Sequence, residues 1–292
     1  MIFSANRHKT AIIAALSLMI SMSACDKQNA SYPSGSAEAV VEAGVTTATG
    51  EEQPSTRRAL ATDTFAYADI EEKLVYGYFA FPADMAEPLP AIILIHERWG
   101  LNDSIRATAQ RLAAEEYIVV AIDLFGGKAT ESTGVARDFE IEVFENPDLA
   151  SENIRQAYQF LIDTFGAPTI ATVGLGFGGG WSLNAAMLLP DDLDASVIFY
   201  GPVVDDQEKL SPVQAPLLGL FAEEDRVVRV NSVLDFEAAL RALDKDFEVE
   251  IYAGVGRGFA DTHSTRYDAQ IAELAWKQTL DFLEQHLKNN TE

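Results

Sequence analysis

Residues 173–181 read VGLGFGGGW, and this glycine-rich stretch decides how the rest of the chain is interpreted. It joins an apolar run to a segment that is typical of a helix. Gly174, Gly176 and Gly179 fit the fingerprint of a dinucleotide-binding turn. That interpretation requires an acidic residue at the end of the next strand, whereas the next apolar run ends at Tyr200 and continues with glycine and proline. The match also follows three earlier predicted strands, so the sequence predicts no bound cofactor.

Apolar runs and helical repeats alternate on both sides of this stretch. Strands are predicted at 74–81, 91–95, 118–124, 169–173, 196–200 and 217–221. Helices are predicted near 105–113, 154–165, 181–189, 231–243 and 268–287. This alternation indicates a mostly parallel sheet with helices on both faces, and residues 61–292 are enough for one such domain.

Another interpretation of the same stretch is a degenerate nucleophile elbow. In α/β-hydrolases the nucleophile lies on a sharp turn between a strand and a helix. Glycines stand two residues before and two residues after it, because larger side chains would collide across the turn. Centred on Gly176, those glycines are Gly174 and Gly178. The centre of the turn is itself a glycine, so the usual nucleophile is missing.

Several separated segments resemble the dienelactone hydrolase family, in the same order along the chain. Residues 95–102 read IHERWGLN and resemble a strand-end motif in which a glutamate precedes bulky residues and then Gly-Leu-Asn. Further segments resemble the next helix and strand, the elbow, the acid loop and the histidine loop; they are 111–127, 174–181, 221–225 and 252–259. The likeness covers roughly residues 62–286 and implies a three-layer α/β-hydrolase fold.

In that family a cysteine attacks an ester or lactone carbonyl, a histidine transfers the proton and an aspartate orients the histidine. The resemblance places the aspartate at Asp225 and the glutamate that helps to control the thiol at Glu97. The cysteine position is Gly176 and the histidine position is Arg257. Glycine has no nucleophile, and arginine stays protonated and cannot act as a base. The resemblance therefore implies a lipoprotein-type member of the family with a degenerate triad.

The two replacements are expected to compensate for each other. Without a histidine, Asp225 would be an unpaired carboxylate near a pocket, and Arg257 on the facing loop offers a charged, bidentate partner. The backbone N–H groups of Arg98 and Phe177 take places that resemble the family's oxyanion hole. We therefore expect a pocket that can hold a small carboxylate or oxyanion.

Three side chains have the chemistry to replace the missing nucleophile or base. Ser182 lies six residues beyond the elbow and is expected inside the helix. His263 is expected on an exposed loop, and His96 should point away from its neighbour Glu97. The sequence thus favours a catalytically impaired protein that binds a small molecule or an envelope protein. The alternative is an active ester or lactone hydrolase that uses a non-family nucleophile, or water activated near Glu97 and Asp225.

The N-terminus is typical of a bacterial lipoprotein. Residues 1–24 combine a cationic start, a short apolar run and small residues before Cys25, although an ordinary signal peptide with an accidental cysteine is the alternative. Residues 25–60 have almost no large apolar side chains and are predicted to be a flexible tether. The acidic residue Asp26 favours the inner membrane over the outer one, with the domain facing the periplasm.

The charge balance excludes several partners. The chain has 45 acidic and 21 basic residues, a net charge of −24, and loss of Arg7 and Lys9 with the leader would make it −26. Nucleic acid and anionic lipid are excluded as partners, since both require Lys and Arg to neutralise phosphates. The membrane is therefore expected to be contacted through the lipid anchor only. One cysteine permits no intramolecular disulfide, and no metal site is predicted.

Overall fold

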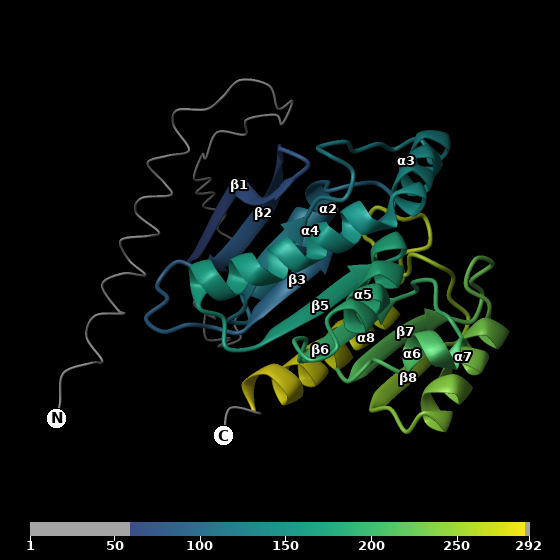
Figure 1. Ribbon diagram of the computed structural model, residues 1–292. Coiled ribbons are helices and arrows are strands. Elements are labelled where there is room, and N and C mark those ends of the chain that lie inside the picture. Colours follow the sequence, from purple (N-terminus) through teal and green to yellow (C-terminus); the bar gives the residue numbers. More distant parts are fainter. Residues whose placement is uncertain (1–58, 290–292) are drawn as a thin grey trace, which may run out of the picture.

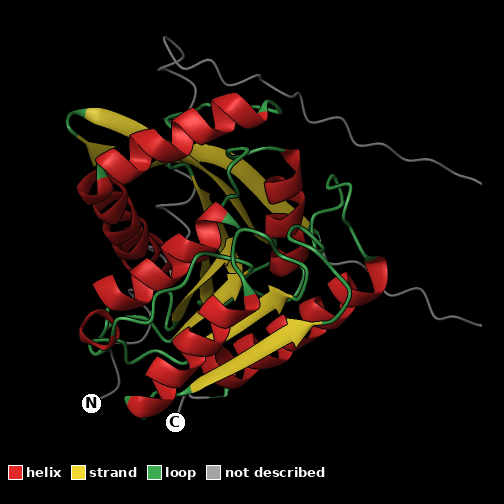
Figure 2. Cartoon of the chain, turned by 90° about the vertical axis from the view of Figure 1, so that its right-hand side faces the viewer, coloured by secondary structure: helices red, strands yellow, loops and turns green. Residues whose placement is uncertain are grey.

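The computed structural model describes residues 59–289. The predicted leader, Cys25 and all but the end of the predicted tether lie outside the described residues. The described part contains one sheet with helices on both of its faces (Figures 1 and 2). This architecture confirms the predicted three-layer α/β-hydrolase fold.

The sheet has eight strands in the order β1-β2-β4-β3-β5-β6-β7-β8. Pairing is antiparallel from β1 through β2 to β4, and it is parallel among β3, β4, β5, β6, β7 and β8. Parallel strands end at one edge of the sheet, so the loops that follow them meet there. The strands are β1 (Leu60–Ile70), β2 (Lys73–Pro82), β3 (Ala91–Ile95), β4 (Ile118–Ile122), β5 (Ile170–Leu175), β6 (Ala195–Phe199), β7 (Leu217–Ala222) and β8 (Phe247–Tyr252).

Helices cover the sheet because each buries an apolar stripe. The helices α2 (Asp103–Ala113) and α8 (Ala269–Leu283) pack on one face. The other face carries α4 (Pro147–Phe160), α5 (Phe177–Leu188) and α7 (Val230–Ala242). The remaining helical segments are α3 (Thr133–Glu145), α6 (Gln207–Leu210), and two π-helical turns, η1 (Leu161–Phe165) after α4 and η2 (Glu284–Lys288) after α8.

The predicted elements are present, with shifted ends, and four further elements of the described chain, β1, β8, α3 and α6, were missed. Edge strand β8 exposes Glu248 and Glu250 at alternate positions, so its sequence contains no continuous run of apolar residues. Strand β1 mixes Thr and Asp with apolar residues, and helix α3 buries only Ala136 and Val143. Short or half-exposed elements carry little periodicity, which is why the sequence pattern does not reveal them.

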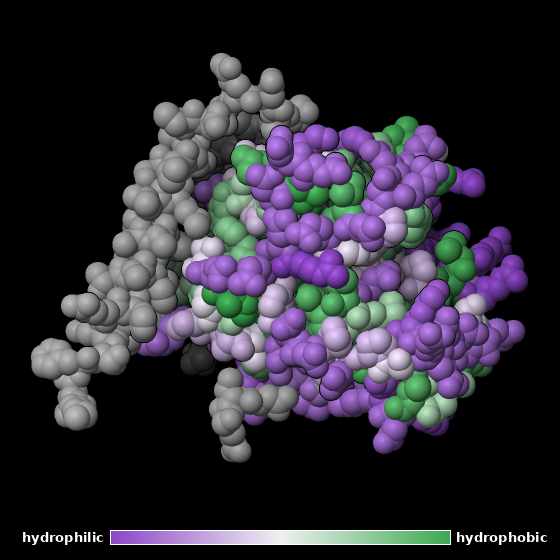
Figure 3. Space-filling model, viewed as in Figure 1, coloured by the Kyte–Doolittle hydropathy of each residue, from purple (hydrophilic) through white to green (hydrophobic). Residues whose placement is uncertain are grey.

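The surface agrees with the excess of acidic residues. Hydrophilic side chains dominate the face shown in Figure 3, and apolar side chains form only small patches on it. Within residues 59–289 the structure contains no helix that is both long enough and apolar enough to span a bilayer.

Candidate active site

Strand β5 enters helix α5 through a sharp turn at Gly176, whose φ is 57° and ψ is −112°. This conformation is strained for any residue with a side chain, and glycine adopts it readily. A β-carbon at Gly174 would lie 2.0 Å from the carbonyl oxygen of Gly178, and one at Gly178 would lie 2.2 Å from that of Ile95. Both flanking glycines are therefore required by close backbone approach, as the elbow interpretation predicts.

Two charged side chains flank the position where a nucleophile would stand. A β-carbon on Gly176 would lie 3.3 Å from Cδ of Glu97 and 3.4 Å from Nη2 of Arg257. Glu97 follows β3, which pairs with β5, and Arg257 follows the edge strand β8. The structure thus brings together Gly176, Glu97 and Arg257, three of the residues that the sequence analysis names. No side chain stands at the centre of the turn.

Asp225 and Arg257 form the predicted ion pair, with 3.3 Å between Oδ2 and Nη1. The Asp225 side chain is 1% exposed and that of Arg257 is 20% exposed. Arg257 also donates a 2.5 Å hydrogen bond to the carbonyl oxygen of Tyr200. Oδ1 of Asp225 accepts the N–H groups of Val227 and Val228 at 2.7 and 3.1 Å. Both oxygens of Asp225 are therefore engaged, which leaves this carboxylate poorly placed to activate water.

Glu97 is the titratable group with the most unusual environment at the elbow. The residue as a whole is part-exposed, but its Oε1 is buried and has no hydrogen-bond partner among the described residues. Burial and the neighbouring charge of Asp261 raise the pKa of Glu97 to about 7, against opposing contributions from Tyr200, Arg257 and Arg98. Near neutral pH this carboxyl group can therefore either hold or release a proton.

A cavity of about 20 Å³ lies beside Glu97. Its lining includes the polar side chains of Asn102, Ser104 and Asp261, and Ser104 donates a 3.1 Å hydrogen bond to Asp261. A polar cavity of this volume accommodates one water molecule. The space beside Glu97 is therefore about the size of one water molecule. Among residues 59–289, no group of three or more His, Cys, Asp or Glu side chains is arranged to hold a metal ion.

The predicted oxyanion donors are the backbone N–H groups of Phe177 and Arg98, which lie at the edge of the sheet where neighbouring strands end. Phe177 is the first residue of α5, and Arg98 follows Glu97 after β3. Within the described chain, neither backbone N–H donates a hydrogen bond to another protein group. The Arg98 side chain instead pairs with Glu140 of α3 at 2.9 Å. Both N–H groups are thus available to an oxygen atom of a bound molecule.

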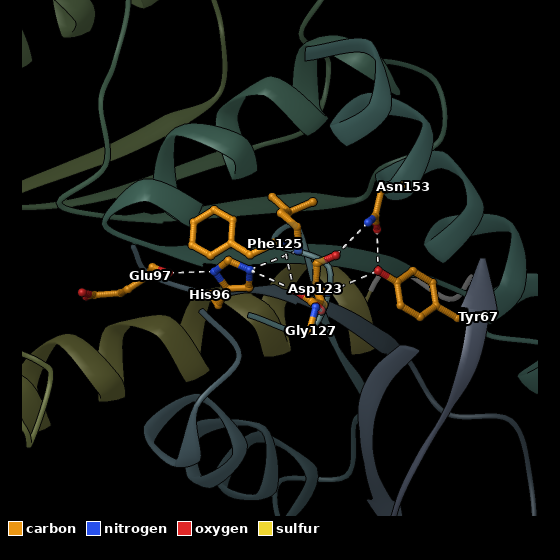
Figure 4. A network of polar contacts seen from close by, with 8 residues as sticks. Tyr67, His96, Glu97, Asp123, Phe125, Gly127 and Asn153 are labelled. Carbon is orange, nitrogen blue, oxygen red and sulfur yellow. Dashed lines mark hydrogen bonds and ion pairs between the residues drawn. The ribbon is translucent and has the colours of Figure 1, made fainter. Parts of the chain in front are cut away.

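His96 is buried on the opposite side of the strand end from the Glu97 carboxylate (Figure 4). Its Nε2 accepts the N–H of Leu124 at 3.1 Å, so Nδ1 carries the hydrogen and donates to the carbonyl oxygen of Glu97 at 2.7 Å. Burial lowers the pKa of His96, although Asp123, 3.8 Å away, opposes this effect. As predicted, His96 points away from the elbow; it holds the backbone of Glu97 and cannot serve as the missing base.

A second part of the same network was not foreseen from the sequence. Asn153 of α4 accepts a hydrogen bond from the hydroxyl of Tyr67 and donates one to the carbonyl of Asp123 at 2.9 Å (Figure 4). The Asp123 carboxylate accepts the N–H groups of Phe125 and Gly127. These bonds fix the loop after β4 and, through His96, the end of β3 that carries Glu97.

Ser182 and His263 do not complete a replacement triad. Ser182 is buried in α5, where its hydroxyl bonds Thr172 at 2.8 Å and Ser196 at 2.9 Å. The His263 side chain is 70% exposed, and its Nδ1 lies 3.6 Å from Asp261. Both positions agree with the sequence-based expectation.

Sequence reasoning missed two residues of the site, Tyr200 and Asp261. Tyr200 follows β6 at the edge where the parallel strands end, and this position alone could have identified it. Its carbonyl binds Arg257, and its buried hydroxyl lies beside Glu97, where it lowers the pKa of that carboxyl group. Asp261 lies four residues after Arg257 on the same loop, and no sequence pattern shows that this loop returns toward Glu97.

Comparisons with known proteins agree with this geometry. A family model described as the dienelactone hydrolase family matches residues 75–287. A protein of Saccharolobus solfataricus named "Putative carboxymethylenebutenolidase" is 27% identical over 241 residues, which cover 70% of this chain and 92% of that protein. Protein usf of Aquifex pyrophilus is 29% identical over 220 residues, covering 73% and 94% of the two chains.

The fold is also similar to solved structures. A dienelactone hydrolase-like promiscuous phosphotriesterase, P91, from metagenomic libraries superposes with a TM-score of 0.70. The two sequences are 19% identical, and the match covers 78% of this chain and 99% of that one. At this level of identity the likeness establishes the fold alone.

Proposed function

Because the chain belongs to the dienelactone hydrolase family, we propose that it is a catalytically impaired member that binds a small carboxylate at the former nucleophile position. The family's covalent mechanism needs a thiol and a base. Here Gly176 supplies no nucleophile and Arg257 no base. The family's nucleophile and base are therefore both missing from the positions at which the family carries them.

The observation that carries the proposal is the position of Arg257. Its guanidinium is held by Asp225 and the Tyr200 carbonyl, and Nη2 lies 3.4 Å from where a β-carbon of Gly176 would stand. A fixed cation beside the free N–H of Phe177 favours a bound oxyanion. The cavity beside Glu97 holds about one water molecule and is lined by neither Arg257 nor Phe177, so the smallest carboxylates, formate and acetate, are the ligands to test.

Glu97 makes this binding depend on pH. Above its pKa of about 7 it is ionised and repels a second carboxylate. Below that pH it is protonated and can donate a hydrogen bond to the ligand, which stays ionised. Affinity should therefore rise on acidification, by about ten-fold from pH 8 to pH 6 if only the protonated form binds.

Acetate titration of the full chain, followed by NMR shifts of the Phe177 amide, measures this dependence. Glu97→Gln should bind with the same affinity at both pH values, because its amide stays uncharged. The exposed residue Glu142 provides a matched control, and Glu142→Gln should keep the pH dependence of the native protein. A native affinity that does not change between pH 6 and pH 8, or no shift at Phe177, would contradict the proposal.

A second candidate function is supported by the cavity and by Glu97 together. A water molecule in the cavity would lie beside a carboxylate that accepts protons near pH 7. Its oxygen would bond the carbonyl carbon of a small ester or lactone while its proton passes to Glu97. The bond between that carbon and the leaving oxygen would then break as Glu97 gives the proton to the leaving oxygen. Asp225 has no part in this step, since its oxygens are engaged. Turnover by the native chain that Glu97→Gln abolishes would favour this candidate over simple binding.

The proposed location is the cell envelope, with Cys25 as the lipidated first residue of the mature protein and the domain in the periplasm. It rests on the leader, on the single cysteine and on Asp26, which favours the inner membrane. Cys25→Ser should abolish incorporation of a palmitate analogue in growing cells and leave the protein unprocessed or released. Equal labelling of the native and Cys25→Ser chains would exclude the lipid anchor.

A further inference from the structure

We propose that the carboxylate bound at the elbow belongs to a molecule with an apolar group, which packs against Phe144 and Ile141 of α3. This inference rests on the proposed carboxylate site and names the class of its ligand: a monocarboxylate with an aromatic or alkyl group on a short linker. Helix α3 follows the loop after β4 and lies at the end of the sheet where the parallel strands finish (Figure 1). It stands at the same end of the sheet as the elbow.

Two apolar side chains of α3 face water. Phe144 is 58% exposed, whereas every other phenylalanine of residues 59–289 is buried or half-buried. Ile141 is 41% exposed and lies three residues before Phe144, so the two side chains are neighbours on the helix surface. Each gains free energy when its apolar surface leaves water. The pair offers that gain to an apolar group of a molecule bound beside it.

Phe144 is held in place by the residue that carries the first oxyanion donor. Its ring meets the ring of Phe177 edge-on, with centroids 5.6 Å apart and planes at 68°. Phe177 is buried and also packs against Phe125 at 5.2 Å, so it does not move freely. Within the described chain its backbone N–H binds no other protein group. The side chain of one residue, Phe177, therefore separates the anion donor from the exposed ring, and a short molecule can reach both.

The second oxyanion donor leads to the same helix. Glu140 stands four residues before Phe144, so the two side chains project from one face of α3. Glu140 accepts a 2.9 Å hydrogen bond from the side chain of Arg98, the residue whose backbone N–H is the other proposed donor. Burial raises the pKa of Glu140, and the charges of Arg98, Arg257 and Arg137 oppose this effect. This face of α3 thus lies beside both donors and within electrostatic range of the fixed guanidinium.

The charges of α3 restrict the rest of the ligand. The helix carries four carboxylates, at Asp138, Glu140, Glu142 and Glu145, and one cation, Arg137. A second carboxylate or a phosphate on the ligand would meet this negative helix and be repelled, whereas an uncharged group would not. The site therefore favours one carboxylate joined to an uncharged, apolar group.

Acetate and 3-phenylpropionate, titrated into the full chain at pH 6 and followed by NMR shifts of the Phe177 amide, test this ligand class. Both carry one carboxylate, and 3-phenylpropionate adds a ring on a short linker. It should bind about ten-fold more tightly than acetate, because part of its ring leaves water against Phe144 and Ile141. 3-Phenylpropanol has the ring without the carboxylate and should bind much more weakly than 3-phenylpropionate.

Variants of Phe144 assign the gain to this side chain. Phe144→Ala should lower the ratio of the two affinities from about ten to about one, and Phe144→Leu, which keeps an apolar side chain, should retain part of it. Leu274→Ala is the matched control, since Leu274 is 46% exposed but lies on α8, and it should keep the native ratio.

The outcomes separate this inference from the carboxylate site on which it rests. If acetate binds and the native ratio is near one, the apolar group has no place on α3 and the carboxylate site stands. The same conclusion follows if Phe144→Ala keeps both the native ratio and the native thermal unfolding. If neither acid shifts the Phe177 amide, the carboxylate site is itself rejected, and the ligand class with it.

Discussion

Gly176→Cys combined with Arg257→His should give the protein measurable hydrolysis of small aryl esters and lactones, at least about 100-fold above the native chain. The elbow backbone, Asp225 and the N–H groups of Phe177 and Arg98 are already in place. The new histidine would stand where Arg257 now contacts Asp225, and Asp225 could then orient it. Either single change should add little, because nucleophile and base act as a unit.

Two features limit the gain. A cysteine at position 176 must adopt a φ of 57°, which costs about 1–3 kcal/mol of stability, and its β-carbon would be 3.3 Å from Cδ of Glu97. Each variant therefore needs a thermal unfolding curve beside its activity. A Cys25→Ser background leaves the thiol at position 176 as the only one, so that titration with a thiol reagent reports its ionisation. A folded double variant with a reactive thiol but no turnover would show that the triad geometry has been lost as well.

The elbow could be predicted from the sequence because its glycines are required by backbone contacts. Gly174 and Gly178 sit where any side chain would overlap a carbonyl oxygen, so the pattern survives even though the nucleophile is gone. The proximity of Asp225 and Arg257 was predicted through the resemblance, which places them on facing loops with opposite charges, although strand β8, which pairs with β7 and leads to Arg257, was not recognised. Features that depend on close contact between backbone segments can be predicted, because they require glycine at fixed positions in the sequence.

Other features depend on the paths of loops and the packing of side chains. The sequence does not show that Asp261 reaches Glu97 or that Tyr200 offers its carbonyl to Arg257. It also does not show that Glu97 and Arg257 close over Gly176, leaving a cavity of about 20 Å³ beside Glu97. The expected pocket rests on the pairing of Asp225 with Arg257 and on the backbone N–H groups of Arg98 and Phe177, and neither feature determines how much space lies beside them.

Arg257→Met should destabilise the folded protein by about 2 kcal/mol, measured as the free energy of unfolding in urea. The change removes the ion pair with Asp225 and the hydrogen bond to Tyr200, and it leaves a carboxylate that is 1% exposed without its cation. Loss of a fully buried pair would cost more. Here the N–H groups of Val227 and Val228 still bind Asp225, and Arg257 is itself partly exposed.

A double-mutant cycle separates this charge effect from lost packing. Asp225→Asn added to Arg257→Met removes the uncompensated charge, so the double variant should be less destabilised than the sum of the single variants by about 1 kcal/mol or more. Arg155→Met, which breaks the exposed pair with Glu152, should cost at most about 0.5 kcal/mol and serves as the control. If Arg257→Met cost no more than Arg155→Met, the arginine would not be compensating for the absent histidine. A large coupling energy between the two changes would instead mean that a histidine at position 257 must also pair with Asp225 if the protein is to keep its stability. The stability of the site and the recovery of hydrolysis would then depend on the same contact.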